Sequence, residues 1–246
     1  MINIENVEVM GWEAAIRGMR NPMNSWEKSD SIFCRREDCV SCVANGDCGS
    51  KQLDFDIGPN DYNLIMRLRN SGTDHRKFMR MITVYLDITA PLYWWKEFDT
   101  YKVGTVANSC STMHKIADKE FTLNDFSIEH LNDDRSAEAS NLEWFERLIT
   151  HLNRDRKRFI ETKDKEYWWQ LIQLLPSSYN QRRTVMLNYE VLANIYKSRC
   201  NHKLDEWREL CTWIERLPYS EIITGEQQNL KEAATYADRD TLMSAT

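Results

Sequence analysis

Alternating apolar and polar positions predict two strands in the first half of the chain. Residues 3–9 (NIENVEV) alternate in this way, and Gly11 ends the stretch. Residues 76–89 (RKFMRMITVYLDIT) alternate over a longer distance and include Val84 and Ile88, whose branched side chains strands favour. The pattern therefore predicts a sheet that contains at least one short and one long strand.

In the rest of the chain, apolar residues mostly recur at the helical period. This pattern predicts eight helices. They are residues 12–19, 61–70, 91–101, 122–131, 137–162, 164–175, 183–198 and 204–216. Asn60 or Asp61 can cap the second helix, and Pro91 suits the first turn of the third. The third runs into a polar loop at residues 104–112. The sequence predicts one α+β domain over residues 1–220 with a helical second half, followed by a polar tail at 221–246.

Composition narrows the class of protein. Hydrophobic residues make up 42% of the 246 residues, which is enough for a sizeable core, while 8 Gly and 5 Pro are few for a sandwich of short strands. The net charge of −6 argues against a general nucleic-acid binder. The sequence has no apolar run long enough for a membrane span and no basic lead before an apolar stretch at its start. We therefore expect a cytoplasmic protein with no membrane and no nucleic-acid partner.

Seven cysteines are present, and an odd number without a secretory signal argues against a disulfide framework. Three of them are expected to be unpaired thiols: Cys110, Cys200 and Cys211. The other four are spaced C-x4-C-x2-C-x5-C: Cys34, Cys39, Cys42 and Cys48. Four thiolates so close together suit a structural Zn²⁺ or an iron–sulfur cluster, and the alternative is a flexible loop with reduced cysteines.

The order of motifs after Gly72 resembles that of a known family. His75 precedes the long alternating strand, Pro91 leads an aromatic helix, and residues 100–112 (TYKVGTVANSCST) follow. In flavin-dependent thymidylate synthases the signature Arg-His-Arg-x-x-Ser-x-Asn-x-x-Ser-x-Arg stands at this place. The alignment of this chain with the family pattern needs no gap from His75 to Thr112. The chain resembles that family in the placement of these elements.

Individual signature positions differ from the family pattern. Lys102 keeps the charge of the second arginine, and the first signature serine falls within a residue of Thr105. The other arginine and histidine positions hold residues without a positive charge: Thr100, Tyr101 and Thr112. If the loop shifts by a residue, polar members of the signature correspond to Asn108 and to Ser109 or Ser111.

A second block, residues 187–207 (LNYEVLANIYKSRCNHKLDEW), resembles the family's late helix, Asn-Leu-Arg-x-x-x-Asn/His-Phe-x-x-x-Arg, with Gln-Trp a few residues on. The matching positions are Asn188, Asn194, Arg199, Glu206 and Trp207. Residues 14–17 (AAIR) echo the family's Ala-Ala-Arg. The resemblance covers most of residues 10–215 and leaves out the cysteine-bearing loop at 34–48.

The resemblance implies a thymidylate-synthase-complementing-protein-like fold with an antiparallel sheet. It also implies a homotetramer that binds FAD between subunits and methylates dUMP with methylenetetrahydrofolate and NADPH. The implied cofactor-binding residues are His75, Lys102, Asn188 and Asn194, and the implied substrate-binding residues are Thr105, Asn108, Cys110 and Arg199. No catalytic residue is assigned.

The planar guanidinium group of arginine can donate two hydrogen bonds to the oxygens of one phosphate. Lysine is a weaker substitute for arginine in this role. The charge of the missing signature arginines can be supplied by Lys102 and by four arginines: Arg17, Arg76, Arg80 and Arg199. Two further functions remain open. One is a protein of the same fold that has lost catalysis and still binds a nucleotide or a flavin. The other is a zinc-stabilised interaction protein, which rests on the cysteine loop alone.

Overall fold

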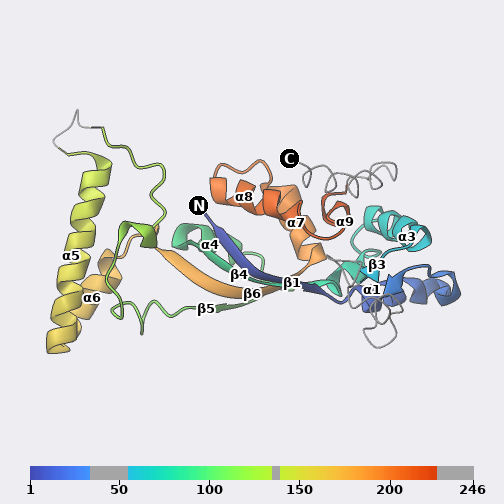
Figure 1. Cartoon of the computed structure of the whole chain (residues 1–246), viewed down its shortest axis with the longest axis horizontal. Coiled ribbons are helices and arrows are strands. Elements are labelled where there is room, and N and C mark those ends of the chain that lie inside the picture. The colour runs from blue at the N-terminus through green and yellow to red at the C-terminus, as the bar shows by residue number, and fades with distance from the viewer. Residues whose placement is uncertain (34–54, 135–138, 226–246) are drawn as a thin grey trace, which may run out of the picture. The chain divides into compact units, whose positions relative to one another are not determined.

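The computed structural model describes residues 1–33, 55–134 and 139–225 (Figure 1). The described chain divides into two compact units. Unit 1 consists of Met1–Glu8, Tyr85–Met186 and Lys203–Leu210. Unit 2 contains the described parts of Val9–Val84, Leu187–His202 and Cys211–Thr246. The four clustered cysteines at 34–48 lie outside the described residues.

A sheet of four strands runs in the order β1-β4-β6-β5. Its strands are β1 (Asn3–Met10), β4 (Thr83–Pro91), β6 (Asn180–Asn188) and β5 (Val106–Ser109). The edge strand β5 pairs antiparallel with β6, with Val106 opposite Met186 and Ser109 opposite Arg183. Helices accompany this antiparallel sheet, so the predicted α+β class is confirmed.

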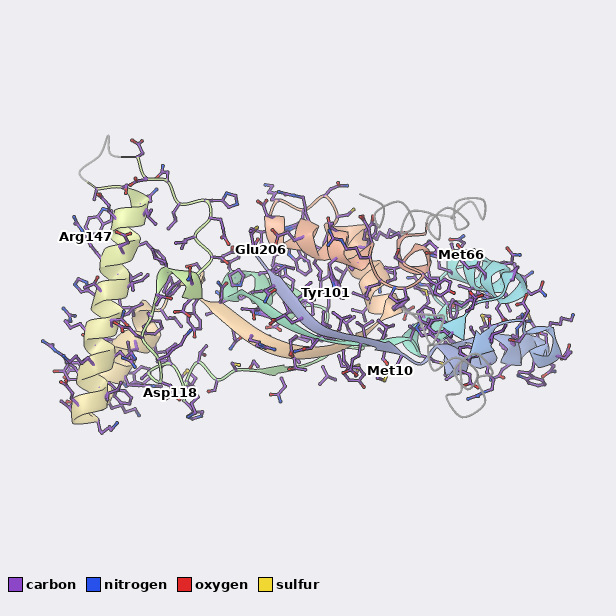
Figure 2. All side chains as sticks on the ribbon, viewed as in Figure 1. Met10, Met66, Tyr101, Asp118, Arg147 and Glu206 are labelled. Carbon is purple, nitrogen blue, oxygen red and sulfur yellow. The ribbon has the colours of Figure 1, made fainter. Side chains whose placement is uncertain are left out.

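Unit 1 contains a helical hairpin of α5 (Asn141–Thr162) and α6 (Lys165–Leu174), which pack against each other (Figure 1). Ser140 begins α5 because its hydroxyl accepts the Glu143 N–H while the Glu143 carboxylate accepts the Ser140 N–H. The buried side of the hairpin joins a core of apolar residues: Ile116, Ala117, Phe121, Phe126, Ile149, Leu152 and Leu171. On the outer side, Arg147 lies over the Trp144 ring at 5.1 Å (Figure 2).

An aromatic cluster forms the other core of unit 1. It joins α4 (Leu92–Phe98) to α8 (Asp205–Ile214), and its members are Trp94, Trp95, Phe98 and Trp207. Trp94, Trp95 and Trp207 are each 0% exposed, so they belong to the core of this unit. Glu206 on α8 (Figure 2) is buried beside them and accepts a hydrogen bond from the Tyr93 hydroxyl.

Unit 2 is built mainly of short helices. They are α1 (Trp12–Arg20), α3 (Pro59–Asn70), α7 (Tyr189–Arg199) and α9 (Glu221–Thr224), with 3₁₀ turns η1 (Asn21–Met23), η2 (Trp26–Lys28) and η3 (Lys77–Arg80). Strands β2 (Ile32–Phe33) and β3 (Phe55–Asp56) form a small antiparallel sheet. The indole of Trp12 contacts the rings of Phe55, Tyr189 and Tyr219. These rings form an aromatic core in this unit.

The structure corrects the predicted elements around the sheet. The helix expected at 183–198 is α7 (Tyr189–Arg199), and its predicted start is too early, because β6 continues to Asn188 and the Asn188 side chain caps the helix. The long strand expected at 76–89 starts only at Thr83, since residues 77–80 form η3 with Phe78 and Met79 buried. The polar loop expected at 104–112 contains β5, whose residues are all exposed and therefore carry no hydrophobic period.

Helix ends also differ from the prediction. The helix expected at 91–101 is α4, which ends at Phe98, and the one expected at 122–131 is reduced to the 3₁₀ turn η4 (Leu123–Asp125). Neither Asn60 nor Asp61 caps α3. The carboxylate of Asp30 accepts both of their N–H groups, at 2.9 and 3.0 Å.

Two predictions concern the chain's last part and the membrane. The polar tail was expected from residue 221, whereas α9 starts there and buries Ile222 and Ile223. Within the described ranges, every helix is too short or too polar to cross a bilayer.

Candidate functional site

A cleft of about 240 Å³ lies in unit 1, where β5 ends and β6 begins. Cys110, Ser111 and Thr112 follow β5 into the cleft, and Gln181 and Arg182 enter it from β6. The other lining residues are Thr89, Lys119, Asn124, Asp125, Tyr179 and Asn180. The end of the signature-like stretch therefore meets a strand that is more than 65 residues away in the sequence.

Backbone hydrogen bonds hold the two walls of the cleft together. The Cys110 N–H donates to the Arg182 carbonyl at 3.0 Å. The Gln181 side chain forms a second bond, in which Nε2 donates to the Cys110 carbonyl at 2.8 Å. These two bonds extend the β5–β6 ladder by one residue, so the position of the exposed Cys110 thiol is fixed relative to β6.

Arg182 is the best-anchored cation of the cleft. Its Nη2 donates to Asp87 Oδ2 at 2.7 Å, and its Nη1 lies 3.4 Å from Glu5 Oε2. Asp87 also accepts hydrogen bonds from the side chains of Thr184 and Asn6. The bonds from Thr184, Asn6 and Arg182 hold the pKa of Asp87 well below its usual range, and Asp87 in turn raises the pKa of Arg182.

The opposite side of the cleft carries a second ion pair. Lys119 Nζ donates to Asp125 Oδ1, and the other Asp125 oxygen accepts the N–H of Thr122 at 2.8 Å. The bond to Asp125 raises the pKa of Lys119, while burial raises the pKa of Tyr179. The cleft therefore offers two cations, the Asp125 carboxylate, three carboxamides and the four hydroxyl side chains of Thr89, Ser111, Thr112 and Tyr179. Such groups suit a phosphate together with a polar ring edge.

The four predicted residues of unit 1 do not all meet in this cleft. Cys110 lines it. Asn108 is exposed on β5 opposite Thr184, and Lys102 is exposed in the turn before that strand. The Thr105 hydroxyl is buried without a hydrogen-bond partner, so it is an unsatisfied group in the same turn.

The predicted residues of unit 2 lie on α7 and near η3. Asn188 is buried, and its side chain accepts the Val191 N–H at 3.0 Å as the N-cap of α7. Asn194 Oδ1 accepts a bond from Arg76 Nη2 at 3.2 Å. Arg199 Nη1 lies 2.9 Å from His202 Nε2, and His75 is exposed in the turn before η3.

Two guanidinium groups share one carboxylate in this part of unit 2. Glu190 forms ion pairs with Arg80 and, at 3.5 Å, with Arg76. The side chain of Arg80 is 54% exposed, and its bond to Glu190 raises its pKa. Two positive charges against one negative charge leave an excess positive charge beside the carboxamide of Asn194. That combination fits a diphosphate group.

Sequence reasoning missed Gln181, Arg182 and Lys119. The first two precede residues 183–198, where a helix was expected, and strand β6 was not recognised. The stretch from Thr184 to Leu187 was an available signal, because Thr184 and Val185 are β-branched residues that strands favour. Lys119 is brought to the cleft by a turn whose capping box appears in the sequence as Thr122 and Asp125.

The metal prediction lies outside the described residues, since it concerns Cys34, Cys39, Cys42 and Cys48. Within residues 1–33, 55–134 and 139–225, no group of three or more His, Cys, Asp or Glu side chains is arranged to hold a metal ion. The described thiols Cys110, Cys200 and Cys211 are free, as expected. Zinc at the cysteine loop stays a prediction.

Solved structures share this fold over most of the chain. The flavin-dependent thymidylate synthase ThyX from Helicobacter pylori, in complex with FAD and dUMP, is 17% identical, with a TM-score of 0.59 over 89% of this chain and 96% of its own. The UMP/dUMP methylase PolB from Streptomyces cacaoi, bound with 5-Br UMP, is 13% identical, with a TM-score of 0.56 over 92% of this chain and 94% of its own. Neither a protein-family model nor a curated protein sequence matches the chain. The predicted thymidylate-synthase-complementing-protein-like fold is thus confirmed.

Proposed function

We propose that the cleft of unit 1 binds dUMP and that the protein methylates it to dTMP with FAD, methylenetetrahydrofolate and NADPH. The observation that carries the proposal is Arg182, a cation held in place by Asp87 and exposed to the cleft beside Ser111 and Thr112. Proteins with the same fold have been solved with FAD and dUMP and with 5-Br UMP. The fold and the cleft together support a uridine nucleotide as the ligand.

Arg182 and Lys119 are assigned to the phosphate. Both are already paired with a carboxylate, so each keeps a fixed position and still has N–H groups free to reach phosphate oxygens. The hydroxyls of Ser111 and Thr112 add neutral donors next to these charges. The Gln181 and Asn180 side chains line the same cleft and match the alternating donors and acceptors of a uracil edge.

FAD is assigned to the basic group of unit 2. The excess positive charge of Arg76 and Arg80 over Glu190 suits its diphosphate, and the Asn194 carboxamide adds a hydrogen-bonding group. When bound, the flavin supplies hydride transfer, and the protein supplies binding and orientation. Asn188 is assigned a different role from the one implied by resemblance, because capping α7 already uses its side-chain oxygen.

A second candidate is a nucleotide-binding protein of the same fold without catalysis. The residues that favour it are Thr100, Tyr101 and Thr112, which stand where the family signature has arginine or histidine. Both candidates require the cleft to bind dUMP, and they differ in whether dTMP is formed. A homotetramer in the cytoplasm is proposed for both, in line with exposed apolar side chains such as Trp144 and Trp169.

The test is made on the purified full chain. Calorimetry is expected to give saturable dUMP binding in wild type and, because hydrogen bonds to charged groups contribute about 1.5–3 kcal/mol, about tenfold or more weaker binding in Arg182→Ala. Arg158→Ala is the matched control, since this exposed arginine on α5 belongs to the same unit and does not line the cleft. Equal binding by all three proteins would contradict the assignment of the cleft.

Catalysis is tested separately. Wild-type protein with dUMP, FAD, NADPH and methylenetetrahydrofolate is assayed for dTMP by chromatography, and the purified protein is inspected for flavin absorbance. Formation of dTMP that is lost in Arg182→Ala supports the enzyme. Binding of dUMP without dTMP, in protein that carries FAD, supports the non-catalytic candidate. Light scattering of the same sample tests the tetramer.

A further inference from the structure

A larger cavity, of about 550 Å³, lies within unit 2 and has no part in the proposed dUMP site. It is formed by the end of α1, the segment after it and one side of α3. Its polar lining consists of Arg20, Ser25, Lys28, Asn60, Asn63 and Arg67. Its volume is within the range of small-molecule sites, roughly 300–1,000 Å³.

Arg20 builds the wall of this cavity. The side chain is 4% exposed, and its Nε donates to Asp61 Oδ1 at 2.6 Å. Its Nη1 donates to the Ser25 carbonyl at 3.2 Å and its Nη2 to the Lys28 carbonyl at 3.0 Å. One buried guanidinium therefore fixes the backbone from Ser25 to Lys28 against α3, which places Lys28 at the cavity.

The neighbouring carboxylates are already satisfied. Asp61 Oδ2 accepts from the hydroxyls of Ser29 and Ser31 and from the N–H groups of Asp30 and Ser31. Asp30 is bonded to the first turn of α3. Among the described residues that line the cavity none is acidic, so Lys28 and Arg67 face it without a competing carboxylate in the lining.

Lys28 and Arg67 are both exposed, and Arg67 Nη2 makes a weak contact with Met23 Sδ at 3.9 Å. The carboxamides of Asn60 and Asn63 line the same cavity, as do the apolar side chains of Met23 and Leu64. A cationic pair, two carboxamides and an apolar patch are complementary to a compact anion joined to a less polar group. This local positive charge contrasts with the chain's net charge of −6.

We propose that this cavity is a further ligand site, separate from the dUMP cleft and from the basic group of Arg76 and Arg80, and that it binds the phosphate of a small phosphorylated molecule through Lys28 and Arg67. Arg20 is a positioning residue there, because its donors are directed at Asp61 and at two carbonyls. Asn60 and Asn63 contact the rest of the ligand. The site is independent of the dUMP cleft, since all of its residues belong to unit 2.

Inorganic pyrophosphate is the probe, and calorimetry on the full chain is the measurement. The protein carries Arg182→Ala and Arg80→Ala, so that binding at the dUMP cleft and at the basic group of Arg76 and Arg80 is weakened and failure of each proposal is seen separately. One saturable site is expected, and Lys28→Gln or Arg67→Gln in this background is expected to raise its Kd about tenfold, the loss of one hydrogen bond to a charged group. Both residues are exposed, so their variants are expected to fold, and circular dichroism confirms this.

Lys197→Gln is the matched control, because Lys197 is an exposed cation on α7 of the same unit and lies outside the cavity. An unchanged Kd in this variant supports the site. An equal loss in all three variants would reduce the effect to general charge attraction and overturn the proposal, as would the absence of saturable binding. Succinate, a dianion without phosphorus, is expected to bind more weakly, and equal affinity would overturn the assignment to phosphate.

Discussion

Arg182 Nη2 lies 2.7 Å from Asp87 Oδ2, and this ion pair joins β6 to β4 beside the cleft of unit 1. Asp87 is itself held by Thr184 and Asn6, so the carboxylate and the guanidinium have one defined arrangement. The pair therefore sets the position of the cation that we propose to bind phosphate. Such preorganisation reduces the free energy that would otherwise be spent on ordering a long side chain.

Asp87→Asn is expected to weaken dUMP binding by about threefold to tenfold, because Arg182 loses its anchor while keeping its charge. Calorimetry with dUMP measures the change. Asp99→Asn is the matched control, since Asp99 pairs with the neighbouring Arg183 at 2.7 Å outside the cleft. An unchanged Kd in Asp87→Asn would show that the ion pair has no part in binding.

The same carboxylate predicts how stability depends on pH. Hydrogen bonds from Thr184, Asn6 and Arg182 lower the pKa of Asp87 in the folded protein, so its contribution is present above the unfolded-state value of about 3.9. That contribution is lost as the pH falls below this value. Urea unfolding of wild type is therefore expected to show higher stability than Asp87→Asn at pH 6 and a smaller difference at pH 3. A difference that grows on acidification would contradict the lowered pKa.

The periodicity of apolar residues predicted those helices and strands that show a clear apolar face in their own sequence. Helices α3, α6 and α8 and strand β1 were expected within a few residues of their observed bounds, because each repeats apolar side chains at its own period. Strand β5 was not predicted, since its four residues are all exposed and only Val106 among them is a residue that strands favour. It exists because β6 offers it a row of backbone partners, which no local pattern records.

The candidate site was predicted only as far as its local part. Cys110 was expected to contact the substrate, and it lines the cleft. Arg182 and Lys119 come from distant segments and were missed, because strand pairing and a capped turn bring them there. The cap of α3 shows the same limit: local sequence suggested Asn60 or Asp61, and the acceptor is Asp30, which stands 30 residues before Asn60 in the sequence.

Asp61→Asn is expected to destabilise the protein by about 3–5 kcal/mol, because it leaves the buried Arg20 guanidinium uncompensated. Burial raises the pKa of Asp61, but hydrogen bonds from Ser31, Ser29 and Arg20 outweigh it and keep the pKa below the usual range. Urea unfolding measures the loss. The exposed Asp74→Asn serves as control and is expected to change stability by less than about 0.5 kcal/mol. A similar small change in Asp61→Asn would contradict a buried, essential ion pair.

The four clustered cysteines predict about one Zn²⁺ per chain, since four thiolates complete a tetrahedral site. Elemental analysis of the purified protein measures it. Cys42→Ser is expected to lose the metal, whereas Cys110→Ser, which removes a free exposed thiol, is expected to keep it. Iron in place of zinc would favour a cluster, and the absence of both metals from wild type would mean that the thiols are free.

Two tryptophans of the aromatic cluster provide a matched pair for measuring one buried hydrogen bond. Trp94 and Trp207 are both 0% exposed, and their rings lie 4.9 Å apart. Trp207 Nε1 donates to Glu97 Oε2 at 2.8 Å, whereas Trp94 Nε1 is buried without a partner. Phenylalanine removes a similar volume at either position, so the cavity cost is common to both variants.

Trp207→Phe is therefore expected to lose about 1–3 kcal/mol more stability than Trp94→Phe, because it removes a donor from Glu97, while Trp94→Phe removes an unsatisfied group. Urea unfolding at pH 7 measures both changes. Glu97→Gln distinguishes the causes: if the bond to Glu97 matters, it is expected to reduce the difference between the two tryptophan variants when combined with each. Equal losses in Trp94→Phe and Trp207→Phe would show that packing alone decides stability in this core.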